Sequence, residues 1–482
     1  MIKKRKNGFS LIEILLAIFI FLIIFSGACF LMLDNLNYSF ASQQRIKAEF
    51  LAQEGLEAVK AIADNNFKDL TAGTYGLNLN NNLWQLIREL ENLNQTLKNG
   101  QRQIVISDVA ANLKEVESRV SWQDIKNNNK ETSLITFLSN WQRNLTGDNW
   151  QNPIEDSYYA MMADARSVFH LGIYTYIGAL NYKGEPDLYI FDTSDLQKPI
   201  LVSTLDLGAK TWATVSSIYV VGNYAYLATN INGREFVVVD ISDPKNPKDV
   251  AYQTTQTMID ATGVHVSGNY AYVSNLWKKN QKQLYVFDVA DPLNPDFFSR
   301  IDLTDSAYNL TFQNNFVFVA SGKDDQELQI IDVTDPANEF IYSTLDLPGD
   351  NDAYDIFVKD NKGYLVRANG TDQAEFYILD LSNLEQPQII SSLELADNFR
   401  TVYAFGPASA ETGDRYMFVG GDLNKEQFQV IDISNQQDPK VISTLDIKGI
   451  VYDLVTDDQA AYLAVGGGET AERGLKIIVA GN

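Results

Sequence analysis

A signature made of an apolar strand, an aspartate and a turn recurs six times in the last two-thirds of this 482-residue chain. Copies such as FVVVDISDPKNP and LYVFDVADPLNP place the aspartate at the same point of the motif. The aspartates are spaced 48, 48, 44, 48 and 52 residues apart: Asp192, Asp240, Asp288, Asp332, Asp380 and Asp432. Such a period indicates that each repeat is one supersecondary unit that packs against its neighbours.

Each unit contains four short segments with the alternation of β-strands. Two segments precede the signature, as in TGVHVSGNYAYVS, and one follows it, as in VISTLDI. Four strands in about 40–50 residues are typical of a β-propeller blade. A seventh unit has Val479 at the signature position and lacks a fourth strand. The sequence therefore predicts seven blades, the last completed by an upstream segment, with Tyr158–Asp164 as the candidate.

The N-terminal end carries a basic cluster and then a long apolar run. Lys3–Lys6 precede Asn7 and Gly8, and residues 9–33 are almost wholly apolar. As a helix, this run would extend about 37 Å, enough to cross a hydrocarbon core of about 30 Å. The basic cluster favours a cytoplasmic N-terminus. Glu13 lies inside the run, where a lone carboxylate costs about 2.5–3.5 kcal/mol, so we expect it to have a partner or a role.

The string KRKNGFSLIE resembles the processing motif of type IV prepilins and type II secretion pseudopilins. In that family a membrane peptidase cuts after the glycine and N-methylates the new first residue. The resemblance implies cleavage between Gly8 and Phe9, methylation of Phe9, and a role for Glu13 in assembly. A carboxylate of one subunit can neutralise the new amino terminus of another in an apolar setting.

Other kinds of N-terminal segment fit this run less well. A secretory signal peptide has a shorter apolar region of about 7–15 residues. A lipoprotein signal ending at Cys29 would lack its usual aliphatic residue at Ser26. The chain also continues with apolar residues at helical spacing, which indicates an amphipathic helix. These residues are Ile46, Phe50, Leu51, Ala58, Val59 and Ile62.

Residues 34–145 resemble the amphipathic helix and small head of minor pilins, chiefly in the segment AQEGLEAVKAIADNNFKDL. Alternating residues predict strands over Arg102–Val109, Glu115–Trp122 and Thr132–Trp141. Turn residues without periodicity then predict a linker. The predicted organisation is a leader over 1–8, a membrane and assembly helix over 9–33, a pilin-like α+β head over 34–145, a linker over 146–157 and an all-β propeller over 158–482.

The repeats resemble the LVIVD-repeat family, whose members are predicted propellers of bacterial and archaeal surface proteins. This resemblance concerns architecture, because a fold alone does not specify biochemistry. The formal net charge of −24 is concentrated in residues 150–482. This acidity argues against nucleic acid or an anionic membrane as the partner of the propeller.

Few residue types suited to catalysis or metal binding are present. The single cysteine excludes an intrachain disulfide or a thiolate zinc site. His170 and His265 lie in predicted strands, and we interpret both as strand residues. The signature aspartates precede turns, where carboxylates accept hydrogen bonds from backbone N–H groups, so we interpret them as structural. Two acidic loops, Lys323–Glu327 and Asp350–Asp352, offer calcium-type oxygen donors without a known calcium spacing. Solvated turns are favoured, and no cofactor is predicted.

These observations predict a minor pilin-like subunit, not an enzyme, that displays an extracellular propeller for adhesion or recognition. The expected partners are other pilin subunits, the prepilin peptidase, the membrane, and an unknown extracellular protein or glycan. The precursor would lie in the cytoplasmic membrane and the mature form in a surface or periplasmic filament. A type II secretion pseudopilin stays open as an alternative. A membrane-anchored propeller enzyme is another, and it would need two carboxylates beside exposed aromatics in the central funnel.

Overall fold

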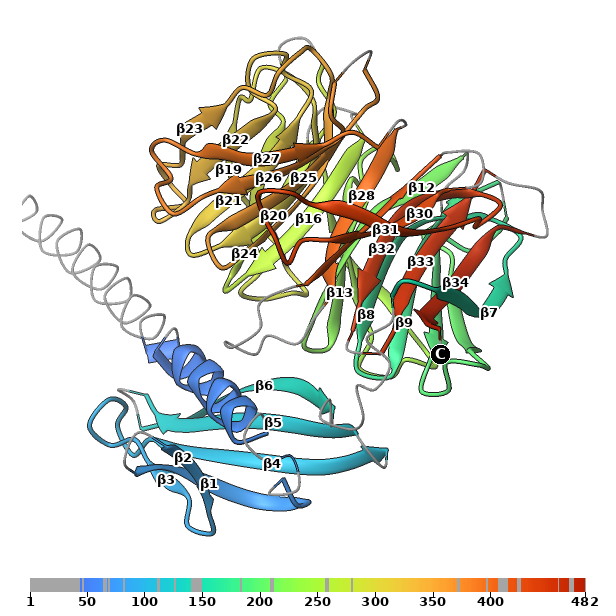
Figure 1. Cartoon of the computed structure of the whole chain (residues 1–482). Coiled ribbons are helices and arrows are strands. Elements are labelled where there is room, and N and C mark those ends of the chain that lie inside the picture. Colours follow the sequence, from blue (N-terminus) through green and yellow to red (C-terminus); the bar gives the residue numbers. More distant parts are fainter. Residues whose placement is uncertain are drawn as a thin grey trace, which may run out of the picture. The chain divides into compact units, whose positions relative to one another are not determined.

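The computed structural model divides into two compact units, Met1–Leu138 and Ser139–Asn482 (Figure 1). No helix among the described residues is long and apolar enough to cross a membrane. The apolar run over 9–33, with the predicted processing site, Glu13 and Cys29, lies outside the described residues. The structure describes residues 44–481 except 46, 64–66, 68–69, 81–82, 111–112, 125–126, 140–149, 183, 209–211, 256–259, 279–280, 371–372, 396–397, 406–414, 423–425, 458 and 468–471.

The N-terminal unit is a helix packed on an antiparallel sheet. The helix covers the described residues from 44 to 63, and the sheet has the order β2-β1-β4-β5-β6, with β3 paired to β4. Its strands are β1 (Gly73–Asn80), β2 (Leu83–Ile87), β3 (Glu91–Asn92), β4 (Gln101–Ala110), β5 (Leu113–Gln123) and β6 (Asn129–Ser139). The three strand segments expected from the sequence fall within or overlap β4, β5 and β6.

Small residues bring the helix close to the sheet. Ala48 and Ala52 are fully buried, and a Cβ on Gly55 would lie 2.3 Å from the Ser118 Oγ of β5. Phe50, which helical spacing placed on the apolar face, is 69% exposed. The buried face is therefore set by small side chains, and sequence periodicity assigned Phe50 to the wrong side of the helix.

The N-terminal unit also contains a buried cation. Arg102 of β4 is 1% exposed and pairs with Glu54 at 2.9 Å and Glu91 at 2.7 Å. Its Nη1 also donates to the carbonyl of Leu51 at 2.6 Å. Burial raises the pKa of Glu91, although Arg102 acts in the opposite direction. The cluster links the helix, β3 and β4 at a single point.

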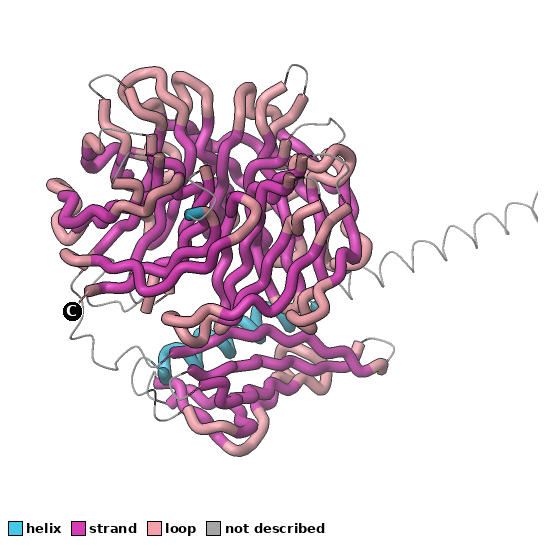
Figure 2. The backbone as a smooth tube through the Cα atoms, turned by 90° about the vertical axis from the view of Figure 1, so that its right-hand side faces the viewer, coloured by secondary structure: helices cyan, strands magenta, loops and turns pink. Residues whose placement is uncertain are grey.

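The C-terminal unit is built almost entirely of strands and loops (Figure 2). Six blades are consecutive: β8 (Asp164–Leu171), β9 (Tyr174–Asn181), β10 (Leu188–Asp192), β11 (Ile200–Leu205); β12 (Ala213–Val221), β13 (Tyr224–Thr229), β14 (Phe236–Asp240), β15 (Lys248–Gln253); β16 (Ala261–Ser267), β17 (Tyr270–Asn275), β18 (Leu284–Asp288), β19 (Asp296–Ile301); β20 (Ala307–Gln313), β21 (Phe316–Ser321), β22 (Leu328–Asp332), β23 (Phe340–Leu345); β24 (Ala353–Lys359), β25 (Lys362–Arg367), β26 (Phe376–Asp380), β27 (Gln388–Leu393); β28 (Phe399–Phe405), β29 (Tyr416–Gly421), β30 (Phe428–Asp432), β31 (Lys440–Leu445). The seventh combines β32 (Ile450–Thr456), β33 (Ala461–Gly466) and β34 (Gly474–Ala480) with β7 (Pro153–Ala160).

The blades form a ring because their inner strands contact one another in order, from β8 through β12 and onward to β32, which contacts β8 again. The second and third strands of each blade are buried on both faces, which explains their near-continuous apolar sequences. Several two-residue turns join the first two strands. Asn314 and Asn315 both have positive φ values, 51° and 65°, as a hairpin turn compatible with strand twist requires.

The ring is closed by β7, which pairs with β34 although the two strands lie at opposite ends of the unit's sequence (Figure 1). Just before β7, Trp150 is 1% exposed, and its ring centroid lies 4.5 Å from that of Phe418. The Trp150 carbonyl also accepts a hydrogen bond from Ser443 at 2.5 Å. The closing strand is thus 153–160 instead of the predicted 158–164, and part of the predicted linker is strand. As an edge strand with mostly part-exposed side chains, β7 shows little apolar alternation.

Candidate functional site

The two ends of the blades differ in regularity. At one end, seven residues separate the third and fourth strands in all six consecutive blades. In each of these turns a signature aspartate accepts a hydrogen bond from the backbone N–H two residues later, at 2.8–3.0 Å. These bonds lower the pKa of Asp240 and Asp380, with Ser242 and Ser382 as donors. This geometry is the one that a structural role requires.

At the other end, the loops differ in length between blades. This end holds the loops between the second and third strands and the connections between blades, which include both acidic segments noted in the sequence. Turns of uniform length have the same structural role in every blade, whereas loops that differ between blades can hold binding or catalytic residues that occur once in the chain. A functional site is therefore expected at the variable end and in the channel below it.

Each inner strand has a β-bulge at the same place, and the second residues of the seven bulges, which we call the bulge residues, form a ring around the channel. The seven residues are Ser167, Ser217, Gly263, Asn309, Asp355, Thr401 and Asp453. Asn309 donates to Asp355 at 2.7 Å, and Asp355 accepts from the backbone N–H of Val402 at 2.9 Å. Asp453 likewise accepts from the backbone N–H of Val168 at 2.9 Å. These bonds connect successive blades.

Burial is the main cause of the raised pKa values of the two carboxyl groups in this ring, about 6 for Asp355 and about 8 for Asp453. Each carboxyl also accepts the N–H of the following residue, Ile356 or Leu454. Backbone N–H groups therefore donate to both carboxyl oxygens of Asp355 and of Asp453. The sequence analysis did not identify this pair, although a polar residue or glycine recurring in otherwise apolar inner strands was a usable signal.

The two histidines occupy different environments. His265 lies 4.3 Å from Tyr219, ring to ring, within an aromatic layer along the channel, and burial lowers its pKa to about 3. His170 stacks on Tyr462 at 4.1 Å, and its Nε2 lies 3.4 Å from Asp457. Both are strand residues packed against neighbouring blades.

An arc of aromatic and guanidinium side chains lies at the mouth of the channel. Its members precede the bulge residues on five blades, and we call them the mouth arc: Tyr308, Tyr354, Arg400, Tyr452 and Arg166. Consecutive members lie 5.1, 5.8, 5.4 and 3.7 Å apart, measured between ring centroids or from a guanidinium carbon to a ring. All are partly exposed, so the arc can be reached from solvent.

Carboxylates pair with the polar groups of the mouth arc. Arg400 contacts Asp422 at 3.0 Å, Arg166 contacts Asp164 at 3.5 Å, and the Tyr308 hydroxyl donates to Asp352 at 2.8 Å. Burial raises the pKa of Asp352, and nearby carboxylates add to the effect. Both guanidinium groups of the arc therefore already have an anionic partner.

The two acidic loops are not equivalent sets of free oxygen donors. Lys323 pairs with Asp325 at 2.7 Å, whereas Glu327 is 1% exposed and accepts from the backbone N–H of Leu347 at 2.8 Å. In the described part of the chain, no group of three or more His, Cys, Asp or Glu side chains is arranged to hold a metal ion. Asp352 of the second loop accepts the hydrogen bond from Tyr308 of the mouth arc.

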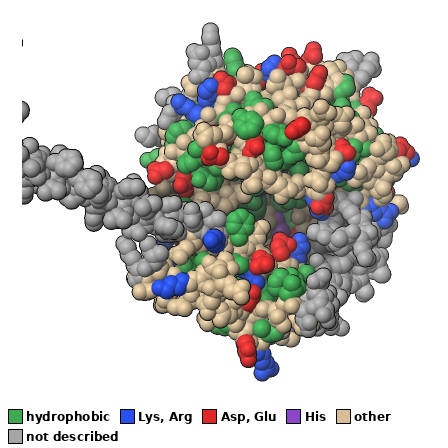
Figure 3. Space-filling view, turned by 90° about the vertical axis from the view of Figure 1, so that its left-hand side faces the viewer, with side chains coloured by type: hydrophobic (Ala, Val, Ile, Leu, Met, Phe, Trp, Pro, Cys, Tyr) green, Lys and Arg blue, Asp and Glu red, His purple; other side chains and the backbone are tan. Residues whose placement is uncertain are grey.

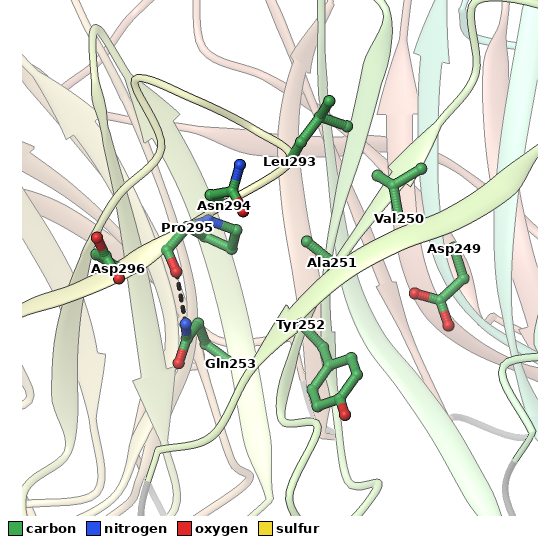
Figure 4. Close-up of a pocket in the computed structure, with 9 residues that line it drawn as sticks. All are labelled: Asp249, Val250, Ala251, Tyr252, Gln253, Leu293, Asn294, Pro295 and Asp296. Atoms are coloured by element: carbon green, nitrogen blue, oxygen red, sulfur yellow. Dashed lines mark hydrogen bonds between the residues drawn. The ribbon is translucent and has the colours of Figure 1, made fainter.

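A shallow groove of about 440 Å³ lies between β15 and the turn before β19 (Figure 4). In the other six blades a serine of the outer strand donates to a carbonyl of the next blade. At the equivalent position in β15 stands Ala251, and Gln253 donates to the Pro295 carbonyl instead. The groove is explained by this substitution, and it does not contain the residues of the mouth arc.

Two family models match parts of the chain. A model of the prokaryotic N-terminal methylation motif matches residues 3–28, and the LVIVD repeat model matches residues 214–254, 260–302 and 306–344. One similar solved structure is titled "Crystal structure of WD40 beta propeller domain of Doa1", with 9% identity and a TM-score of 0.47 over 69% of this chain and 98% of that one. No curated protein matches the chain. The prepilin-type motif and the LVIVD repeats expected from the sequence are confirmed.

Proposed function

We propose that the chain is a minor pilin-like subunit of a type IV pilus or related filament, which displays its propeller outside the cell for recognition. The observation that carries this proposal is the methylation motif over residues 3–28, followed by a helix-and-sheet unit and a separate propeller. The motif concerns delivery and assembly, whereas the propeller supplies a surface that assembly does not need.

In this proposal the prepilin peptidase cleaves between Gly8 and Phe9 and methylates Phe9. Glu13 then neutralises the amino terminus of a neighbouring subunit inside the filament. The other partners are pilin subunits and the membrane before assembly. In this proposal the helix and sheet of the N-terminal unit serve as a pilin-like head.

The size of the propeller supports a minor or terminal position. A domain of about 330 residues has a radius of gyration near 20 Å and a width of roughly 50 Å, whereas packed helices lie about 8–10 Å apart. A propeller on every subunit would crowd the filament surface. A sparse or tip location avoids this steric conflict.

A type II secretion pseudopilin shares the same processing motif, and purified filaments distinguish the two. One observation would fit the alternative of an anchored propeller enzyme: Asp355 and Asp453 place two carboxyl groups in the ring around the channel. We assign these carboxyl groups a structural role because one oxygen of each accepts a backbone N–H of the adjacent blade, and the other accepts the N–H of the following residue.

Mass spectrometry of the mature chain and immunogold labelling of purified filaments test the proposal. We expect an N-terminus at methylated Phe9 and sparse propeller label on surface filaments. The Glu13→Ala variant should still be processed but should not enter filaments, whereas Glu49→Ala serves as a control. A lipidated Cys29, or dense label along whole filaments, would overturn the proposal.

A further inference from the structure

We propose that the variable end of the propeller binds a neutral polysaccharide, with sugar rings stacked on Trp212 and Trp277 and sugar hydroxyls bonded to the mouth arc. This inference deepens the recognition role proposed above and rests on it. The first observation that supports it is the exposure of large aromatic side chains at the variable end.

Trp212 and Trp277 are 68% and 50% exposed, although tryptophan is the largest apolar side chain. Trp212 directly precedes β12, and Trp277 follows β17, so both lie at the variable end. Tyr182, 39% exposed, lies in a loop of the same end, and its ring meets that of Trp212 edge to face at 5.4 Å. Aromatic side chains exposed together at one end of a repeat indicate a binding surface more than a packing requirement.

The mouth arc does not extend over the second and third blades, which these tryptophans adjoin. Five blades place a tyrosine or arginine just before the bulge residue, but the second and third blades have the smaller residues Ser216 and Thr262. Trp212 leads into the second blade, and Trp277 belongs to the third. The backbone N–H of Trp277 donates to Ser306 Oγ at 2.9 Å, which links its loop to the segment that leads into the fourth blade.

The charges around the mouth favour a neutral ligand. Arg400 and Arg166 are paired with Asp422 and Asp164, and Arg473 also pairs with Asp164, at 3.2 Å. An anionic ligand would have to displace these carboxylates, and it would approach an acidic propeller. A cationic ligand would meet the guanidinium groups. A polyhydroxylated chain avoids both conflicts.

The same groups suit hydroxyls chemically. Guanidinium N–H groups donate, carboxylates accept, and tyrosine hydroxyls can do either, whereas each sugar hydroxyl can both donate and accept. Tyr354 adds a partly exposed aromatic ring beside the polar groups. On the face seen in Figure 3, acidic side chains are dispersed among hydrophobic and other side chains, without one dominant basic patch.

The test uses the full chain purified in detergent and a panel of soluble polysaccharides, with binding measured by affinity electrophoresis and tryptophan fluorescence. The panel contains neutral glucans, mannans and galactans, the acidic polymer polygalacturonate and the cationic polymer chitosan. We expect at least one neutral polymer to bind and to shift the fluorescence to shorter wavelength. Binding of only an acidic or cationic polymer, or of none, overturns the inference.

Variants locate the site. Trp212→Ala and Trp277→Ala should each weaken binding about 10-fold or more, as the loss of a stacked ring predicts. Phe340→Ala is the matched control, because Phe340 is 52% exposed but follows a signature turn at the uniform end, and it should bind as the wild type does. Equal losses in all three variants, or no loss in the tryptophan variants, contradict the proposed site.

Filament incorporation of the same variants separates this inference from the proposed function. The tryptophan variants should enter filaments normally while losing polysaccharide binding. If the wild-type chain binds the polymer but never enters filaments, the filament role fails and the binding site stands. If it enters filaments but binds no neutral polymer, only the binding site fails.

Discussion

In its described part, the N-terminal unit contains one buried ionic cluster, whereas the propeller repeats the same few hydrogen bonds from blade to blade. Arg102 and its partners occur once. The aspartate turn occurs six times, and the serine bond between outer strands and next blades also occurs six times among the described residues. Repetition spreads stability over many equivalent bonds, each of which contributes little.

The clasp is an exception within the propeller. Trp150 and β7 close the ring once, so the propeller also depends on unrepeated contacts. The relevant difference therefore lies between unrepeated and repeated interactions, and both units contain unrepeated ones. Substitutions of unique residues should have large effects in either unit, and substitutions of repeated residues should have small ones.

The largest effect is expected from Trp150→Ala. Removing a fully buried tryptophan costs about 4 kcal/mol, because apolar contacts are lost and a cavity remains. Urea titration, followed by proteolysis of β7 and by circular dichroism, measures the free energy of unfolding of the propeller. Trp212→Ala, at an exposed site, should change it by less than about 0.5 kcal/mol. A loss below about 1 kcal/mol for Trp150→Ala would refute a unique clasp.

Arg102→Ala should destabilise the N-terminal unit by about 3 kcal/mol, because it leaves the partly buried Glu91 without its cation. Burial already raises the pKa of Glu91, so the loss should be smaller at pH 5 than at pH 8. Thermal unfolding at both pH values measures this. Arg119→Ala is the control, because its side chain is 37% exposed, and it should cost at most about 1 kcal/mol. Similar losses for both variants would contradict the importance of burial.

Glu327→Gln should raise the stability of the propeller by about 1–3 kcal/mol at pH 8. Burial raises the pKa of Glu327 to about 7 from an ordinary value of 4.5, so the folded state holds a proton that the unfolded state has lost between these values. Stability therefore falls as pH rises through this window. Glu327→Gln removes this pH dependence, so the variant and the wild-type protein should be nearly equally stable near pH 4.5.

The chain contains a precedent for this variant. Gln283 occupies the equivalent position in the third blade and accepts from the backbone N–H of Leu303 at 3.0 Å. The reverse change, Gln283→Glu, should therefore create a loss of stability between pH 5 and pH 8. Unfolding midpoints across this range test both variants, and parallel pH profiles for all three proteins would disprove the expected linkage.

The smallest effect is expected from Ser343→Ala. Its hydroxyl donates to the Leu384 carbonyl at 2.5 Å, and loss of one such bond costs about 0.5–1.5 kcal/mol. The second blade already has Ala251 at this position and remains folded. Ala251→Ser should cause no loss. If urea titrations of Ser343→Ala show a loss above about 3 kcal/mol, this repeated bond contributes as much to stability as an unrepeated contact, contrary to the prediction.

Local patterns were sufficient for the repeating parts of this protein. The aspartate spacing predicted four-stranded units, and the signature turns have the hydrogen bonds that aspartate chemistry suggested. The sequence also predicted the helix of the N-terminal unit, but it did not predict which face of this helix is buried. Phe50 is exposed while Ala48 and Ala52 are buried, because packing against the sheet requires close approach and not only apolar character.

Only the tertiary structure determined which single residues close or line the ring. Trp150 and β7 lie in a segment without strand alternation, since an edge strand has one side exposed and can tolerate polar side chains. Asp355 and Asp453 are far apart in sequence, and the bulges of different blades bring both into one ring. The sequence determined the repeating unit because its bonds are local. Closure, channel and mouth arise from contacts between blades, which no single repeat encodes.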